Sequence, residues 1–258
     1  MKFLRLATIT ALSMSIIGGG SSVLAAEIQN HDTEVGVRFS AVDEDGNGQE
    51  TEVINPEEEG PDVEIDPIGP DGENTGPLTI SYAPTMDFGQ QVITNQNMSY
   101  SMIAEEQPLK VDGEMVPYVS FAQVQDTRGT NAGWDLRVTL SDFTADTQND
   151  TLHGATIEFV SSHLRYVGNE GNEPVVHTDG LTLDAGGSAN SVLSAEQGKG
   201  AGTSSVVWGD QEALDQQEGT VLNENILLHI PGSTAKDEAN YEATLTWQLL
   251  QTPGATGE

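Results

Sequence analysis

Cysteine is absent from this chain of 258 residues, so no disulfide bond can compensate for a small hydrophobic core. Basic residues are scarce, because nine lysine and arginine residues stand against 41 acidic residues and give a formal net charge of −32. Such a chain is expected to repel nucleic acid, anionic polymers and lipid head groups, and its binding is expected to depend on pH and divalent cations. Its fold must rest on apolar burial alone.

Long apolar runs are lacking except at the N-terminus. Lys2 and Arg5 begin the chain, an apolar stretch spans residues 6–17, and small residues follow, which predicts a secretory signal peptide over residues 1–26. A retained anchor is the alternative, although the stretch is short for a membrane span and no second one follows. Residues 251–258 hold no hydrophobic tail and no L-P-x-T-G-type sorting signal. We therefore expect a secreted protein without membrane insertion, attached to any surface non-covalently.

Motifs of catalytic and metal sites are also missing. The chain contains no H-E-x-x-H, no G-x-S-x-G and no phosphate-binding loop, so we predict no enzyme activity, no catalytic residue and no metal site. Residues 233–236 match S-x-x-K without its partner motifs, and His229 in an apolar run is expected to be a satisfied or edge histidine and not a metal ligand. Residues 43–48 begin like a calcium loop, but Ile54 stands where a bidentate Glu is needed. We therefore expect no cofactor and at most a weak Ca²⁺ dependence.

An acidic, proline-rich segment divides the chain. Residues 43–73 hold thirteen acidic residues, four prolines and no basic residue. Such a stretch cannot bury enough apolar area to offset the entropy lost on ordering it, so we predict a solvated Pro/Gly-rich linker over residues 41–77. Before the linker, alternation within residues 27–40 predicts a short strand, which either pairs with the main domain or frays. After it, residues 78–258 are expected to form one domain.

Short strands separated by turn residues characterise this domain. Alternating segments predict strands at residues 78–82, 91–93, 117–124, 134–140, 155–160, 180–183, 205–208, 225–230 and 241–250. Glycine, asparagine, aspartate and serine fill the intervals, and only residues 211–217 and 235–240 favour a helical turn or two. The pattern predicts an all-β fold, either a β-sandwich or an irregular barrel of short strands.

The tripeptide W-x-L occurs twice, beginning at Trp134 and at Trp247. Apolar and polar residues alternate along both surrounding segments, as in strands that bury one face. This alternation places Trp134, Leu136, Trp247 and Leu249 on the apolar faces. We therefore interpret these four motif residues as structural core.

Charged residues on the opposite faces and in nearby loops are the candidate contacts to a ligand or partner. Asp135 and Arg137 alternate with the apolar residues of the first W-x-L strand, and Asp126 and Arg128 precede that strand. Because these side chains are expected to remain solvated, we predict binding through them and not through the tryptophans.

In their order along the chain, these motifs resemble the WxL family of Gram-positive surface proteins. The resemblance is carried by residues 76–82, 87–89, 117–119, 125–130, 133–136 and 246–249, followed by Pro253. It implies a short, single-domain member: an all-β module that attaches non-covalently to the cell wall, with peptidoglycan as ligand. It also implies a membrane-anchored surface protein as partner.

Two further functions compete with wall binding. The first is an adhesin or surface-complex subunit whose direct partner is a bacterial or host protein, with indirect wall association. The second is a secreted carbohydrate-active enzyme, since acidic pairs of the kind that glycosidases use occur in the chain. Missing catalytic motifs disfavour the enzyme, so attachment to the bacterial cell surface is the leading hypothesis.

Overall fold

The computed structural model describes residues 53–67 and 76–251, together with Val37. The predicted signal peptide over residues 1–26 lies outside the described residues. The same holds for the calcium-like loop at residues 43–48 and for the predicted strand in residues 27–40 apart from Val37. All that follows concerns the part of the chain from residue 53 onward.

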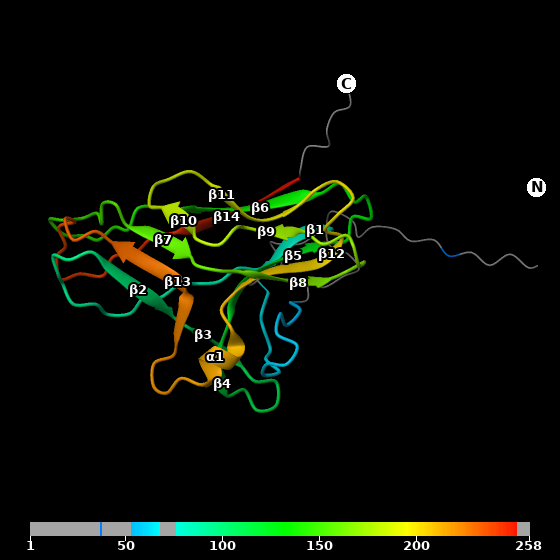
Figure 1. The fold of residues 1–258 in the computed structure, drawn as a ribbon, viewed down its shortest axis with the longest axis horizontal. Coiled ribbons are helices and arrows are strands. Elements are labelled where there is room, and N and C mark those ends of the chain that lie inside the picture. Colours follow the sequence, from blue (N-terminus) through cyan, green and yellow to red (C-terminus); the bar gives the residue numbers. More distant parts are fainter. Residues whose placement is uncertain (1–36, 38–52, 68–75, 252–258) are drawn as a thin grey trace, which may run out of the picture. The chain divides into compact units, whose positions relative to one another are not determined.

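Antiparallel β-strands make up this part of the chain, which confirms the predicted all-β class (Figure 1). The strands are β1 (Leu78–Tyr82), β2 (Met98–Ile103), β3 (Glu105–Pro108), β4 (Met115–Tyr118), β5 (Ser120–Asp126), β6 (Trp134–Leu140), β7 (Thr156–Phe159), β8 (His163–Val167), β9 (Val175–Val176), β10 (Leu181–Asp184), β11 (Asn190–Ala195), β12 (Gly202–Trp208), β13 (Leu222–Ile230) and β14 (Leu245–Gln251). A short helix, α1 (Gln211–Asp215), follows β12. None of the described segments is a helix long and apolar enough to span a membrane.

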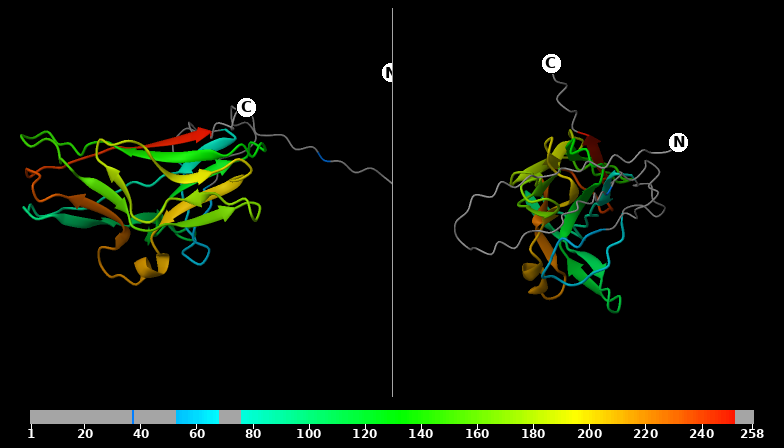
Figure 2. Two further views of the ribbon diagram at one scale, coloured as in Figure 1. Left: turned by 45° about the horizontal axis from the view of Figure 1, so that its top comes forward. Right: turned by 90° about the vertical axis from the view of Figure 1, so that its right-hand side faces the viewer.

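Three four-stranded sheets surround the main core. Their strand orders are β1-β5-β12-β8, β10-β7-β13-β2 and β14-β6-β11-β9, and β3 pairs with β4 in a separate ribbon. Neighbours in each sheet come from distant parts of the chain, so the sheets are held by long-range pairing. In Figure 2 the three sheets wrap around one another, while the β3–β4 ribbon and α1 project from one side.

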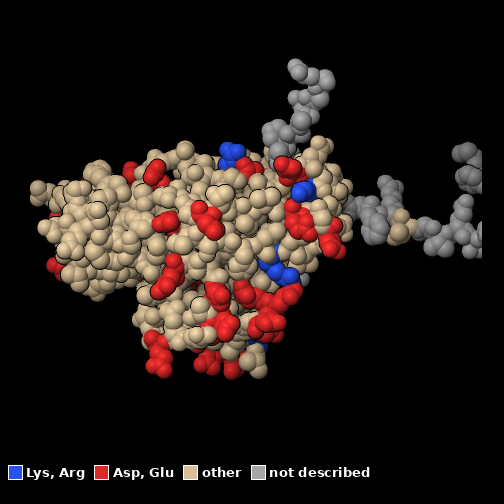
Figure 3. Space-filling view, viewed as in Figure 1, with Lys and Arg blue, Asp and Glu red and all other residues tan. Residues whose placement is uncertain are grey.

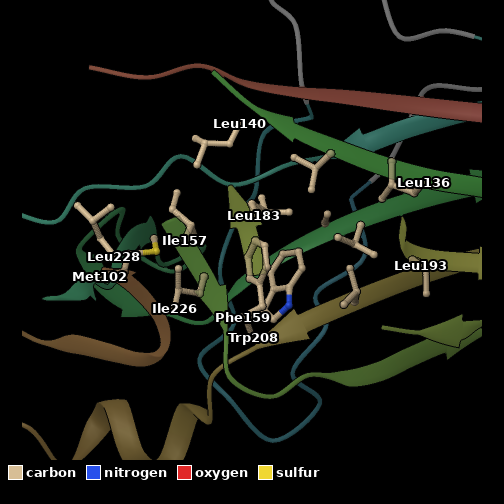
Figure 4. Packing of buried hydrophobic residues seen from close by; sticks show 14 of the residues in the cluster. Met102, Leu136, Leu140, Ile157, Phe159, Leu183, Leu193, Trp208, Ile226 and Leu228 are labelled. Carbon is tan, nitrogen blue, oxygen red and sulfur yellow. The ribbon is translucent and has the colours of Figure 1, made fainter. Parts of the chain in front are cut away.

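Trp208 lies at the centre of the main core. Its ring stacks on that of Phe159 with centroids 4.6 Å apart, and the ring of Trp247 lies 6.3 Å away. Figure 4 shows the Phe159 and Trp208 rings among labelled aliphatic side chains of the sheets β10-β7-β13-β2 and β14-β6-β11-β9. Stacked aromatic rings bury a large apolar area, which matters in a chain that has no disulfides.

The sheet β1-β5-β12-β8 is covered on both faces. Alternate residues of β5 and β12, such as Val124 and Val206, enter the main core. Residues of the opposite face, such as Phe121 and Val207, enter a second cluster with Leu214 of α1. Burial on both faces explains why nearly every residue of β5 and β12 is buried.

Part of the predicted linker forms the outer wall of this second cluster. Val63 and Ile65 are buried in it. Ile54 and Gln123 exchange two hydrogen bonds: the Ile54 backbone N–H donates to Oε1 at 3.0 Å, and Gln123 Nε2 donates to the Ile54 carbonyl at 2.7 Å. The prediction of a solvated linker therefore does not hold for residues 53–67. Alternating apolar residues among the acidic ones provide a face that can be buried.

Some predicted elements differ from the structure. Residues 91–93 form no strand and lie in an irregular segment, in which Gln91 Nε2 donates to the Phe88 carbonyl at 2.6 Å. Residues 235–240 form an irregular segment with a bend at residues 238–239 and no helix, whereas α1 begins where predicted, capped by the Asp210 side chain. The predicted strand at residues 134–140 coincides with β6. Strands β2, β3, β8, β9 and β11 were not predicted.

Candidate functional site

The two W-x-L segments lie on neighbouring antiparallel strands. Strand β14 pairs along β6 so that Leu249 stands opposite Leu136 and Trp247 opposite Val138 (Figures 1 and 2). The two copies of the motif, far apart in the sequence, thus form one structural unit. Their apolar side chains all pack on the main core, as the alternation predicts.

The two motif tryptophans differ in exposure. Trp134 is fully buried, and its indole Nε1 donates to the Gly200 carbonyl at 3.0 Å. Trp247 is only partly buried, and its ring forms part of the surface of an open pocket. Leu136 is also fully buried, and Leu249 is partly buried. The first copy of the motif is therefore core, and the second reaches the surface.

Asp126 and Arg128, two of the predicted contact residues, are buried against each other. Arg128 Nε and Nη2 donate to the two carboxylate oxygens of Asp126 at 2.9 and 2.7 Å, and Nη2 also donates to the Gly133 carbonyl at 2.9 Å. Only 9 % of the Arg128 side chain and 1 % of the Asp126 side chain are exposed. This bidentate pair ties the loop between β5 and β6 and leaves little surface for a ligand.

Asp135 and Arg137, the other two predicted contacts, lie on the outer face of β6. Arg137 Nε donates to Asp135 Oδ2 at 2.6 Å, and Ser191 Oγ on β11 donates to Asp135 Oδ1 at 2.5 Å. The Arg137 side chain is 44 % exposed. This pair can therefore be reached from outside the domain, and the prediction of a contact there concerns mainly Arg137.

His229 is satisfied on the outer face of the sheet β10-β7-β13-β2. Its Nδ1 lies 2.7 Å from Ser99 Oγ, and its Nε2 lies 2.7 Å from a Glu158 carboxylate oxygen. These three side chains come from adjacent strands β2, β13 and β7, and none of them lines a described pocket. The arrangement therefore works as a hydrogen-bonded ladder across the sheet.

His177 connects the core to the surface through Trp208. Trp208 Nε1 donates to His177 Nε2 at 2.8 Å, and His177 Nδ1 lies 2.8 Å from the Thr178 carbonyl oxygen. The carbonyl can only accept, so Nδ1 carries a proton. Nε2 accepts from the indole N–H and therefore carries none, so the imidazole ring is neutral. Burial lowers the pKa of His177, which favours the same neutral form.

A buried carboxyl lies beside the β3–β4 ribbon. Glu105 Oε1 accepts from the backbone N–H of Thr85 at 2.9 Å and from the Tyr82 hydroxyl at 3.3 Å. Burial raises the pKa of Glu105, and burial together with the Glu105 charge raises the pKa of Tyr82. These hydrogen bonds connect the end of β1 and the segment after it to Glu105 of β3.

A groove of about 680 Å³, here called the end groove, opens at one end of the main core. Its sides are residues 86–93, 236–241 and 243. Its floor consists of inner-face residues of β2 and β13 and of residues in the loop after β6: Tyr100, Phe143, Leu152, Leu228 and Ile230. Its volume is within the range of small-molecule and cofactor sites, which often occupy the mouths of β-barrels. No single segment of the sequence contains this site, because it arises where distant segments meet.

Aromatic rings and polar groups share the surface of the end groove. Phe88, Tyr100, Phe143 and Tyr241 supply the rings, while Gln90, Gln91 and Asn240 supply amides. Lys236, the lysine of the S-x-x-K match, donates from Nζ to the Thr94 and Thr234 carbonyls, both at 3.0 Å. The remaining charged side chains that line the groove are acidic: Asp87, Asp237 and Glu238. Such a surface suits a neutral ligand that offers both apolar faces and hydrogen-bonding groups.

Comparison with known families supplies the context for this fold. The sequence model of the WxL domain, described as a surface cell wall-binding domain, matches residues 26–253. Comparisons with curated proteins and with solved structures find no match. The family is defined by wall binding and is not an enzyme family. The match spans nearly the whole chain and includes both W-x-L strands, so the chain belongs to the WxL family of cell wall-binding surface domains.

Proposed function

We propose that this domain binds peptidoglycan at the end groove and so holds the protein non-covalently on the bacterial cell surface, as a subunit of a surface complex. The observation that carries the proposal is that four aromatic residues and three amide side chains line the same groove: Phe88, Tyr100, Phe143 and Tyr241, with Gln90, Gln91 and Asn240. Ring faces pack on the apolar faces of sugars, and amides exchange hydrogen bonds with hydroxyl and acetamido groups.

Charge also favours the neutral glycan strand over other wall polymers. Three acidic side chains and one lysine line the groove, and the lysine donates to backbone carbonyls. An anionic polymer would meet repulsion there, whereas an uncharged sugar chain would not. Figure 3 shows acidic side chains crowded over α1 and the β3–β4 ribbon, and few charged side chains on the viewed face at the end where β2 begins.

Binding to purified sacculi tests the proposal. Mature protein is mixed with washed, protein-free sacculi, and the pelleted fraction is measured. Ala239→Trp places a bulky ring in the groove at an exposed position and is expected to weaken binding by at least about tenfold, or about 1.4 kcal/mol. Ala235→Trp in the same loop, exposed and outside the groove, is the matched control.

Other results would change the assignment. Failure of the wild-type protein to pellet would favour the alternative, a direct protein partner, and soluble sugar fragments would reveal an enzyme. Equal binding by both tryptophan variants would exclude the groove. Arg137→Ala then tests the second candidate contact, because this side chain is accessible and its removal leaves the buried Asp126–Arg128 pair intact.

A further inference from the structure

Strand β14, which contains the second W-x-L motif, is an edge strand of its sheet. Among the described residues, β14 pairs with β6 alone. The Ser141 N–H donates to the Thr244 carbonyl at 3.0 Å, and the register then continues unbroken along β6. Because hydrogen-bonded positions alternate in an antiparallel pair, Trp247 and Leu249 turn their backbone N–H and C=O groups to the open side.

This edge lacks the features that usually protect exposed strands from pairing. Charged residues, proline, bulges and short length discourage edge pairing. Of the other edge strands in the described part, β1 and β2 have irregular registers, β3, β8 and β10 carry charged residues, β4 contains a proline, and β9 has two residues. Strand β14 has seven residues, LTWQLLQ, an even register and neither charge nor proline.

An uncharged pocket of about 570 Å³, here called the β14 seam, accompanies this edge. It lies between residues 83–86, which follow β1, and the start of β14, and its lining includes Trp247, Leu245 and core residues such as Phe143. No charged residue lines it, although the chain has 41 acidic residues. The seam adjoins the end groove, since both are lined by Met86, Phe143 and Ala243.

We propose that an extended segment of another protein adds to β14 as a further strand. Its main chain hydrogen-bonds the outward N–H and C=O groups of Trp247 and Leu249, and its alternate apolar side chains fill the β14 seam. A polypeptide supplies donors and acceptors at the two-residue repeat of the edge, which a glycan does not. Repulsion between two molecules of net charge −32 disfavours a second copy of this chain as the partner. The same repulsion favours a partner segment without acidic residues, and the uncharged seam favours one whose alternate residues are apolar.

A synthetic peptide provides the probe. The capped peptide Lys-Thr-Val-Thr-Val-Thr-Val-Thr-Lys is added to the mature protein, and amide hydrogen exchange is followed along the chain. Exchange of the Trp247 and Leu249 amides is expected to slow by at least about tenfold. The same peptide with every valine and threonine N-methylated keeps its side chains but loses its donors, and is expected to give no protection.

Two variants separate this site from wall binding. Ala83→Trp fills the β14 seam and is expected to abolish peptide protection while leaving the melting temperature and sacculus binding unchanged. Ala239→Trp in the end groove is expected to keep peptide protection, whether or not the proposal of wall binding there holds. Protection by the N-methylated peptide, protection unaffected by Ala83→Trp, or protection confined to another edge strand would overturn the inference. A dimer of the protein alone that protects the same amides would assign the edge to a second copy.

Discussion

At the scale of single residues, the tryptophans of the two W-x-L copies have different structural roles. Trp134 is enclosed so tightly that a Cβ on Gly200 would lie 2.6 Å from its Nε1. Gly200 also has a φ of +75°, so glycine is needed there for conformation as well as for space. Trp247 instead lies between the core and the β14 seam. Identical motifs thus serve the fold in one strand and line a surface pocket in the other.

Substitution of the two tryptophans should separate these tasks. Trp134→Ala is expected to lower the free energy of unfolding by about 3–5 kcal/mol, because it leaves a cavity in the core. Trp247→Ala is expected to cost less, because its ring is partly solvated already. Urea unfolding measures both. A Trp134→Ala protein that kept its stability yet lost wall binding would contradict a core role for this residue.

The hydrogen bond from Trp208 to neutral His177 predicts that the free energy of unfolding depends on pH. The pKa of His177 is lowered in the fold, so the unfolded chain binds the proton more readily. The stabilisation contributed by neutral His177 is complete above the ordinary histidine pKa of about 6.5. It is lost as the pH falls through that value toward the lowered pKa of His177 in the folded protein. His177→Gln, which can still accept from Trp208, should flatten the profile between pH 7.5 and 5. His153→Gln, at an exposed position, is the control.

At the scale of elements, the sheet β1-β5-β12-β8 depends on a covering layer. Residues 53–67 lie over its second face, where Val63 and Ile65 are buried and their neighbours Asp62, Glu64 and Asp66 are exposed. Lys110 pairs with Asp62 at 3.0 Å, and Arg165 pairs with Glu58. The acidic side chains keep the layer solvated outside while its apolar ones complete the second cluster.

Truncation of the covering layer tests its contribution. Ile65→Ala is expected to lower the free energy of unfolding by about 2–5 kcal/mol, as for other buried isoleucines. Glu64→Ala, one residue away and exposed, should change it by less than about 0.5 kcal/mol. Thermal or urea unfolding distinguishes the two. Equal, small effects would mean that residues 53–67 add nothing to the stability of the sheet.

At the scale of the whole molecule, net charge sets the conditions for wall binding. With a net charge of −32 the protein is anionic near neutral pH, as are teichoic polymers of bacterial walls. Repulsion of this kind is long-ranged but screened by salt. Our proposal therefore places attachment at a local surface suited to a neutral ligand, the end groove.

Sacculus binding should strengthen as this repulsion is removed. The pelleted fraction is expected to rise as the pH falls from 8 toward the isoelectric point near 4.1, and on addition of Ca²⁺ at constant ionic strength. Circular dichroism at each pH checks that the fold persists, because protonation of His177 opposes folding. If sacculus binding weakened on acidification while the protein stayed folded, repulsion between the protein and the wall polymers would not be what limits binding.

Local patterns explain which elements were predictable. Strand β6 alternates so regularly that its bounds follow from the sequence, whereas β11 (NSVLSA) does not alternate. Strand β2 (MSYSMI) alternates over residues 98–102, so its pattern carried a strand signal that the prediction leaves out. The acidic average of residues 53–67 predicts a solvated linker, because it hides Val63 and Ile65, which are buried in the second cluster. The end groove could not be predicted, because its floor joins inner-face residues of β2 and β13 with loops far away in the sequence.

The all-β class, the inward faces of both W-x-L strands and the resemblance to a wall-binding family all follow from the amino-acid sequence alone. Each of these rests on residue alternation or on motif order, which are local properties of the chain. Three further features emerge only in the folded chain: the two motifs are neighbours, Asp126 and Arg128 bind each other, and Trp247 borders an edge that is open among the described residues. These depend on which distant strands pair, and pairing is selected by the burial of the whole core and not by any one segment.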